Sequence, residues 1–381
     1  MILHQKLAFI GTITRSYDDE YAKEGAKIGD TLKIRLPNRY TVGTGPAITP
    51  QDTTEASVSL VVGTQKHVPM SFTSSELTLS IDDFTERIIE PAMSVLAANM
   101  EADAFTMAQD VHQQVGTPGT TPTALLTYLQ ANARLSNSLA PLSTRCLQLH
   151  PLASATIIDS LKGLFHDSSA IEKQYREGIM GRTAGLDWYD NTLAPSITNG
   201  NKVAAVTVSG AGQTGATLTI GGLAMGDTFK KGQVFTAAGC NEVHPETKVD
   251  TGRLQKFVVT ADTTSGGATV ALPISPSIVI TGASQNVTAS PTNGGAVTFD
   301  GTASLVYPVE LSYHKQAFAL ASADLVMPKG LDFGARDSMD GISMRIIRDY
   351  DVTTDKIITR VDTLYGFKTI RAELAARVAS G

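Results

Sequence analysis

The chain has 381 residues, of which 42% are apolar and 18% charged, so it can bury a sizeable core and form two or more compact units. Its net charge of −6 argues against a dedicated nucleic-acid-binding protein, which would carry a basic surplus. Residues 1–40 contain seven Lys and Arg against five acids, a slight excess that we interpret as solvated surface. The two cysteines, Cys146 and Cys240, lie far apart, which excludes a disulfide framework and a metal knuckle and favours a reducing compartment.

The sequence shows no targeting segment. The residues after Met1 lack the apolar region of a signal peptide, and no apolar run approaches the roughly 20 residues that span a bilayer. We therefore expect a soluble protein without membrane contact, made and used in the cytoplasm.

Two extended segments near the N-terminus form a predicted pair of strands. Residues 30–37 alternate apolar and polar side chains, and residues 56–62 follow the same pattern. Between them, residues 41–54 are rich in Gly, Thr and Pro and too polar to be buried. Because an isolated two-stranded ribbon is marginal in water, we expect this arm to lie on a neighbouring molecule.

A long amphipathic helix is predicted to follow from Ser80, with Asp82 and Asp83 in its first turn near the positive end of the helix dipole. Pro91 should bend or break it. Methionines at sevenfold spacing indicate core packing rather than a binding groove. The apolar positions that recur at steps of three, four and seven are Ile81, Phe84, Ile88, Val95, Leu96, Met100, Ala104, Met107 and Val111.

Residues 122–200 have a mixed α/β pattern. We predict a helix from Pro122 to Ser138, a strand at Arg145–Leu149, a helix over 151–162, and a loop followed by a strand within 179–194.

The composition changes near Thr198. Residues 200–301 hold 16 of the 33 glycines and show no helical periodicity. Several short strands separated by turn residues are typical of a small barrel or sandwich. The predicted strands are Val203–Val208, Ala216–Ile220, Gln233–Ala237, Leu254–Thr260, Ala268–Leu272 and Ile278–Ile280. Mixed composition returns afterwards, so the β-rich block is interpreted as a domain inserted into a second, α/β domain. The strands predicted after it are Glu310–Tyr313, Ala317–Ala321, Ser343–Tyr350 and Ile357–Leu364.

Motifs for chemistry are weak. Gly210, Gly212 and Gly215 match the spacing of a dinucleotide fingerprint, but the residues that follow alternate like a strand, whereas the fingerprint requires a helix. The seven histidines do not pair at ligand spacing, and no serine lies in a nucleophile elbow. We therefore predict no catalytic residue, no metal and no cofactor, and the protein is not expected to be an enzyme.

Four stretches resemble one known family. The closing strands of tailed-phage major capsid proteins are similar to residues 340–351 and 360–368 of this chain. The strand that precedes them in that family is similar to residues 313–321. Residues 231–239, 245–252 and 257–261 resemble the inserted domain of the Salmonella-podovirus coat type, and residues 30–111 match the order and size of an extended loop and spine helix. The resemblance covers most of the chain.

The resemblance implies an α+β architecture, the Hong Kong 97-like capsid fold with an inserted β-barrel or sandwich. The segments it implies are an N-terminal arm (1–29), an extended loop (30–75), a spine helix of the peripheral domain (76–121), an axial domain (122–200), the inserted domain (201–306), and return strands of the peripheral and axial domains (307–381).

It also implies a structural protein of the virion, which assembles in the host cytoplasm as hexamers and pentamers of an icosahedral head around double-stranded DNA. Expected partners are further copies of the chain, a separate scaffolding protein, a portal protein and a possible decoration protein, with weak, non-specific contact to DNA. The candidate subunit-contact residues on and beside the arm are Arg39, Thr44, Gly45, Pro46 and Lys66. The alternative is a β-rich phage tail or surface protein, which would not account for the long helix.

Overall fold

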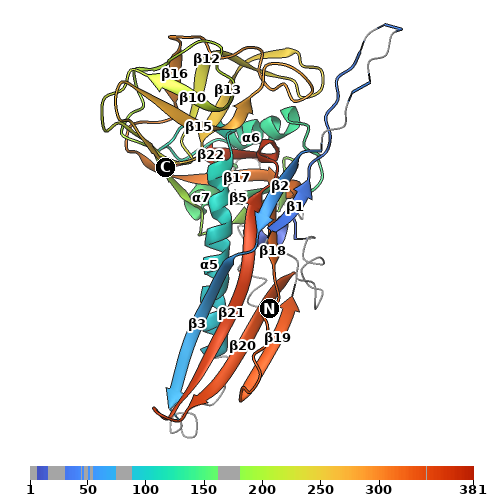
Figure 1. Cartoon of the computed structure of the whole chain (residues 1–381), viewed down its shortest axis with the longest axis vertical. Coiled ribbons are helices and arrows are strands. Elements are labelled where there is room, and N and C mark those ends of the chain that lie inside the picture. The colour runs from blue at the N-terminus through green and yellow to red at the C-terminus, as the bar shows by residue number, and fades with distance from the viewer. Residues whose placement is uncertain are drawn as a thin grey trace. The chain divides into compact units, whose positions relative to one another are not determined.

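The computed structural model describes residues 7–15, 31–43, 45–46, 50–51, 55–73, 88–161, 181–339 and 341–381 (Figure 1). The chain divides into two compact units. The first comprises Met1–Leu36, Ser57–Phe105 and Phe318–Ile370, and the second comprises Pro37–Ala56, Thr106–Ala317 and Arg371–Gly381.

A five-stranded antiparallel sheet forms the centre of the first unit. Residues 356–365 of its longest strand pair with β3 along one side, and residues 365–369 pair with β18. The strands are β18 (Phe318–Ser322), β21 (Lys356–Thr369), β20 (Ile342–Asp351) and β19 (Phe333–Met339) in that order, with β3 (Thr64–Thr73) beside β21. The strands predicted at 317–321, 343–350 and 357–364 are thereby confirmed.

Helix α5 (Glu90–Phe105) contacts β3 and β21 and buries Leu96, Met100 and Ala104. Pro91 is the second residue of α5. The bend or break predicted there in a longer helix stays a prediction, since most of the segment before it lies outside the described residues. The helix start predicted at Ser80 lies outside the described residues. Val95, expected on the apolar stripe, is 55% exposed, so that assignment is wrong.

The two arm strands pair as predicted, β1 (Thr31–Arg35) antiparallel to β2 (Ser57–Val61). Their apolar side chains are not left for a neighbouring molecule. Leu32, Ile34, Leu60 and Val62 form one buried cluster with Ala319 and Ala321 of β18. The expectation that these strands need another molecule to cover them is therefore wrong, because their own chain already does so.

A mixed seven-stranded sheet forms one part of the second unit. Helix α6 (Leu125–Asn137) packs on β17 and β22, and helix α7 (Pro151–Leu161) follows β5. Both helices and strand β5 lie where the sequence predicts them. The strand order is β4 (Gln114–Val115), β22 (Ala375–Ala379), β17 (Val306–His314), β5 (Arg145–Leu149), β7 (Leu186–Asp190) and β6 (Arg182–Thr183), with β8 (Ser196–Thr198) beside β17.

The glycine-rich block folds as a closed six-stranded barrel rather than a sandwich (Figure 1). Phe229, Phe235, Phe257 and Phe299 pack together inside it with ring centroids 5.2 to 5.7 Å apart, so side chains fill the interior. The strand order around the barrel is β10 (Gly215–Gly221), β15 (Thr269–Ile278), β13 (Asp250–Val259), β12 (Val234–Val243), β16 (Ala296–Phe299) and β9 (Val206–Val208), and β11 (Thr228–Phe229) pairs with β14 (Thr263–Thr264) outside it.

Two sequence interpretations are decided by this barrel. Gly215 begins a strand and not a helix, so the glycine spacing at 210–215 is no dinucleotide fingerprint. The separate strand predicted at 278–280 is wrong, because Ile278 ends the long strand β15.

The chain enters and leaves the barrel at one place. The backbone N–H of Ser304 donates to the Gly200 carbonyl at 2.9 Å, and that of Asn199 donates to the Leu305 carbonyl at 2.9 Å. We propose that residues 201–306 fold as a separate domain, since they have their own aromatic core. An excised fragment of these residues is expected to be soluble and to unfold cooperatively on heating, with the circular dichroism of a β protein. A random-coil spectrum would contradict the proposal.

Candidate functional site

The tip of the arm carries exposed apolar side chains on a short bridged segment. Val42 is 95% exposed and Tyr40 57%. Gln51 closes the base of the tip, because its side-chain amide accepts from the Thr41 N–H at 2.9 Å and donates to the Thr41 carbonyl at 2.6 Å. Val42, which lies beyond this bridge, is therefore presented to solvent.

The structure describes two of the three candidate contact residues of the tip. Thr44 lies outside the described residues. Gly45 and Pro46 are exposed, and Gly45 has φ +104°, a backbone conformation that residues with a side chain rarely adopt. Their role in subunit contact stays a prediction.

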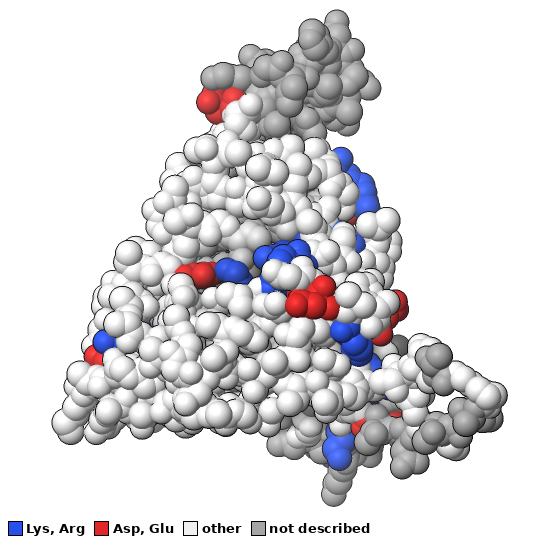
Figure 2. All heavy atoms as spheres, turned by 90° about the horizontal axis from the view of Figure 1, so that it is seen from above, with Lys and Arg blue, Asp and Glu red and all other residues white. Residues whose placement is uncertain are grey.

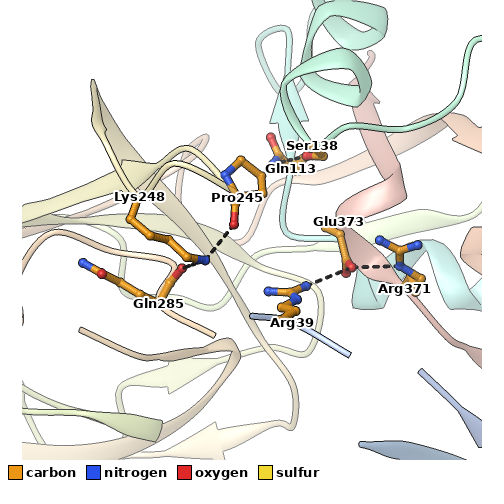
Figure 3. Close-up of polar contacts among 8 residues, drawn as sticks. All are labelled: Arg39, Gln113, Ser138, Pro245, Lys248, Gln285, Arg371 and Glu373. Atoms are coloured by element: carbon orange, nitrogen blue, oxygen red, sulfur yellow. Dashed lines mark hydrogen bonds and ion pairs between the residues drawn. The ribbon is translucent and has the colours of Figure 1, made fainter. Parts of the chain in front are cut away.

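Arg39, at the base of the arm, belongs to a cluster of charges (Figure 3). The Oε1 atom of Glu373 accepts from the Arg39 guanidinium at 3.4 Å and from the Arg371 guanidinium at 3.1 Å. The Lys248 ammonium donates to the carbonyls of Pro245 and Gln285 at 2.7 and 3.1 Å. Burial and the nearby Arg39 charge lower the pKa of Lys248.

We call Arg39, Lys248, Arg371 and Glu373 the basic cluster, since the two arginines share the Glu373 carboxylate and the Lys248 ammonium feels the Arg39 charge. The Arg39 side chain is 47% exposed, so its guanidinium has N–H groups left to donate to solvent or to another carboxylate. The other three members come from the β12–β13 turn of the barrel and from the segment before β22.

Lys66, the fifth candidate, lies in β3 and is engaged within its own chain. Its Nζ atom is 2.6 Å from Oδ2 of Asp103 on α5, and the Tyr365 hydroxyl donates to the same oxygen at 2.7 Å. The carboxylate of Asp103 thus ties the helix to two strands of the sheet. Sequence reasoning placed Lys66 beside the arm but had no signal for this pairing.

Charges on the surface neutralise one another locally. Figure 2 shows one face on which Lys and Arg side chains lie next to Asp and Glu, while wide areas carry neither. Ion pairs of the barrel and its surroundings include Lys202–Asp227, Lys230–Asp262, Lys231–Asp110 and Lys256–Asp300. A surface of this kind offers little for a phosphate backbone.

Two buried charged residues, Arg377 and Glu310, were missed by sequence reasoning. Arg377 in β22 is completely buried, and its guanidinium donates to the Gly232 carbonyl of the barrel at 2.8 Å and to the Ala108 carbonyl at 3.4 Å. It thereby fastens a barrel turn to the sheet of the second unit. The available signal is one cation inside the apolar run Ala375–Ala379.

Glu310 in β17 is also completely buried, beneath α6. Burial raises its pKa to about 7, although the hydroxyls of Tyr128 and Ser380 act in the opposite direction. Burial likewise lowers the pKa of His112 to about 4, so this imidazole is neutral at pH 7. These groups lie inside the fold rather than at an open cleft, which suits a structural role.

The described part of the chain holds neither a cluster of metal ligands nor a membrane-spanning helix. Among these residues, no three His, Cys, Asp or Glu side chains gather as metal ligands. No described helix has both the length and the apolar character needed to cross a bilayer.

Comparison with known proteins identifies the family. The family model described as P22 coat protein, gene protein 5, matches residues 26–378. A search of the curated proteins found no match.

Among solved structures, one from Mycobacterium phage Che8 aligns with a TM-score of 0.51 at 10% identity, over 96% of this chain and 89% of that chain. Two further alignments are weaker. The capsid structure of the cyanophage P-SCSP1u gives 0.45 at 10% identity over 93% and 84% of the two chains, and the mature capsid of bacteriophage PhiM1 gives 0.47 at 8% identity over 93% and 83%.

The chain has the Hong Kong 97-like fold. Its elements are a five-stranded sheet with a long helix beside it and a closed barrel. The match to the coat-protein model extends over nearly the whole chain, barrel included. The chain therefore belongs to the P22 coat protein family of structural phage capsid proteins.

Proposed function

We propose that this coat protein forms the hexamers and pentamers of an icosahedral phage head that encloses double-stranded DNA. The observation that carries the proposal is the coat-protein family match over residues 26–378. The buried placement of Glu310 and His112 agrees with a structural role. No observation favours the alternative of a tail or surface protein.

The arm tip and the basic cluster are the surfaces proposed to contact neighbouring copies. Val42 and Tyr40 offer apolar area, while Arg39 offers a half-exposed cation beside an incompletely neutralised cluster. Exposed apolar side chains favour protein contact. Arg39, Thr44, Gly45 and Pro46 are thus proposed as contact residues, and Lys66 as a residue that could join them only by leaving Asp103.

The remaining partners follow from the same proposal. A separate scaffolding protein would guide assembly, a portal protein would replace one pentamer, and a decoration protein could bind the finished surface. The protein would assemble in the cytoplasm of the bacterial host and end in the virion.

Deletion of residues 41–54 is expected to give a folded protein that does not form shells. The arm strands keep their own buried cluster, so folding should be unaffected, while the exposed tip is lost. Sedimentation and electron microscopy measure the result. A variant with a glycine–serine segment of equal length is the control for spacing, and shell formation by the deletion variant would contradict the role of the tip.

Contact with DNA is expected to be weak and independent of sequence. The chain carries a net charge of −6, and many barrel lysines are already paired with acids. Only phosphate contacts should contribute, so the affinity should fall steeply as salt is raised. Gel-shift measurements over a salt series test this expectation, which sequence-selective binding at physiological salt would contradict.

A further inference from the structure

A completely buried carboxyl lies beneath the first turns of α6. Glu310 in β17 has no exposed surface, and no hydrogen bond of normal geometry reaches either carboxyl oxygen from the described residues. The hydroxyl of Tyr128, on α6, favours the ionised carboxylate, but burial has the larger effect. A carboxylate at this place has lost its water without gaining a partner, so the packed structure favours the neutral acid.

No cation among the described residues pairs with Glu310, although three arginines lie on the elements around it. Arg145 of β5 donates instead to α6 and the segment that follows it. Arg134 of α6 pairs with Glu242 at 3.5 Å. Arg377 of β22 lies on the other face of the sheet, because it is one residue out of register with Glu310. Ionised Glu310 would therefore be a buried charge without a counter-ion.

The other titratable groups around Glu310 keep one charge state between pH 6.5 and 8. Burial raises the pKa of Tyr128, so its hydroxyl keeps its proton. Burial lowers the pKa of His112 to about 4 and also lowers that of His314, so both imidazoles are neutral. Cys146 of β5 lies on the other face of the sheet, since its register partner in β17 is three residues from Glu310. A response in this range of pH therefore belongs to Glu310.

The two ends of α6 are held unequally. At its start, Ala124 occupies the N-cap position, no side chain caps the free backbone N–H groups, and no acid lies in the first turn. Near its end, the buried Arg145 side chain donates to the side chains of Asn132 and Ser136 at 2.5 and 3.0 Å. It also donates to two backbone carbonyls just after the helix, at 2.6 and 2.8 Å. The first turns, which carry Tyr128, thus open at a lower cost than the last ones.

We propose that residues 125–131 of α6 act as a proton-controlled lid, which stays packed on β17 while Glu310 is neutral and lifts once Glu310 is ionised. Lifting admits water to the carboxylate, and the Arg145 contacts keep the rest of the helix in place. The pKa of the carboxyl is about 7 in the packed state and returns toward its ordinary value of 4.5 when the lid is lifted. The packed state therefore binds the proton more tightly, and raising the pH favours the lifted state. This inference does not depend on the proposed function.

Hydrogen exchange of the full chain tests the lid. The amide N–H groups of residues 129–132 donate to the first turn of α6, so lifting exposes them to water. The exchange rate of the wild type is divided by that of Glu310→Gln at the same pH, which cancels the intrinsic pH dependence. This ratio should rise at least about tenfold between pH 5.5 and 8 for residues 129–132, and should stay constant for α7. A ratio that does not rise, or that rises equally in α7, overturns the proposal.

A capping variant tests where the helix opens. Ala124 is exposed and has φ −117° and ψ 137°, the extended conformation of an N-cap residue. Ala124→Ser should therefore slow the exchange of residues 129–132 at pH 8 by about fivefold. Ala133→Ser is the matched control, since this exposed alanine lies inside the helix, where serine cannot cap it. Equal exchange in the two serine variants overturns an opening that begins at the N-terminal end.

Fluorescence gives an independent readout of the same motion. Trp188 of β7 is the one tryptophan of the chain, and its ring lies 5.4 Å from that of Tyr128 between centroids. Lifting the lid removes Tyr128 from this contact. The emission of Trp188 should change between pH 6.5 and 8 in the wild type and stay constant in Glu310→Gln. The same change in both proteins, or no change in the wild type, overturns the proposal.

Discussion

The variant Gly366→Ala is expected to lower the free energy of unfolding by about 3 kcal/mol or more and to loosen the arm. Gly366 lies in β21, where the arm strand β2 packs directly on the sheet. A Cβ atom at this position would overlap the carbonyl oxygen of Val61 and lie 2.9 Å from the Cα of Val62. Backbone atoms cannot move aside as a flexible side chain can. The arm strands β1 and β2 must therefore shift away from β18, with which they form a buried cluster.

Gly63→Ala is the matched control for this prediction. Gly63 follows the same arm strand, but a Cβ there would meet only a Val61 methyl group at 3.8 Å, an ordinary contact. Urea unfolding gives the stability of each variant, and limited proteolysis within 37–56 reports the release of the arm. Equal stability of the Gly366→Ala and Gly63→Ala variants would show that the arm strands β1 and β2 do not pack on β21.

Stability should also depend on pH through Glu310. The carboxyl has a pKa of about 7 in the folded chain against 4.5 as its ordinary value. Below pH 4.5 both states hold the proton, and Glu310 contributes no difference. Between pH 4.5 and 7 only the unfolded chain loses it, so the contribution of Glu310 to stability falls as pH rises. The total loss is about 3 kcal/mol and is complete above pH 7.

The variant Glu310→Gln removes this ionisation and keeps the side-chain shape. It should match the wild type near pH 4.5 and exceed it by up to about 3 kcal/mol at pH 8. Glu373→Gln, which changes a partly exposed carboxylate in the same unit, serves as the comparison variant. His112, whose pKa burial lowers to about 4, acts in the opposite direction below pH 6.5, so the test is the difference between the two proteins. A difference between the Glu310→Gln variant and the wild type that stays constant between pH 5 and 8 would contradict the account.

Elements with a strong local pattern were predictable from the sequence. The alternation in 30–37 and 56–62 gave both arm strands, and turn residues around short apolar runs indicated a closed β domain. Burial on one face imposes such patterns, which is why they can be recognised without a structure.

Elements whose environment comes from distant residues were missed. Strand β19 is exposed at residues 333–338, because it lies at the edge of its sheet and has no buried face to impose alternation. Strand β22 is buried at every position between two neighbours, so Ala375–Ala379 shows no alternation either. Val95 has the spacing of a core residue but faces solvent.

The candidate contact residues illustrate the same limit. A glycine-rich polar tip can be recognised from its local sequence. The ion pairs cannot, because Arg39 pairs with Glu373, 334 positions away, and Lys66 pairs with Asp103, 37 positions away. Arg377 and Glu310 depend on partners contributed by the barrel and by α6. The leucines of α6 were assigned to a helix, and only the structure shows which of them face solvent.

Electron microscopy of the full chain expressed in bacteria, alone and together with a scaffolding protein, tests the central claim most directly. The account predicts closed shells whose surface resolves into rings of six subunits, with rings of five at the vertices. Protein that remains monomeric under both conditions, or that forms only open fibres, would contradict it.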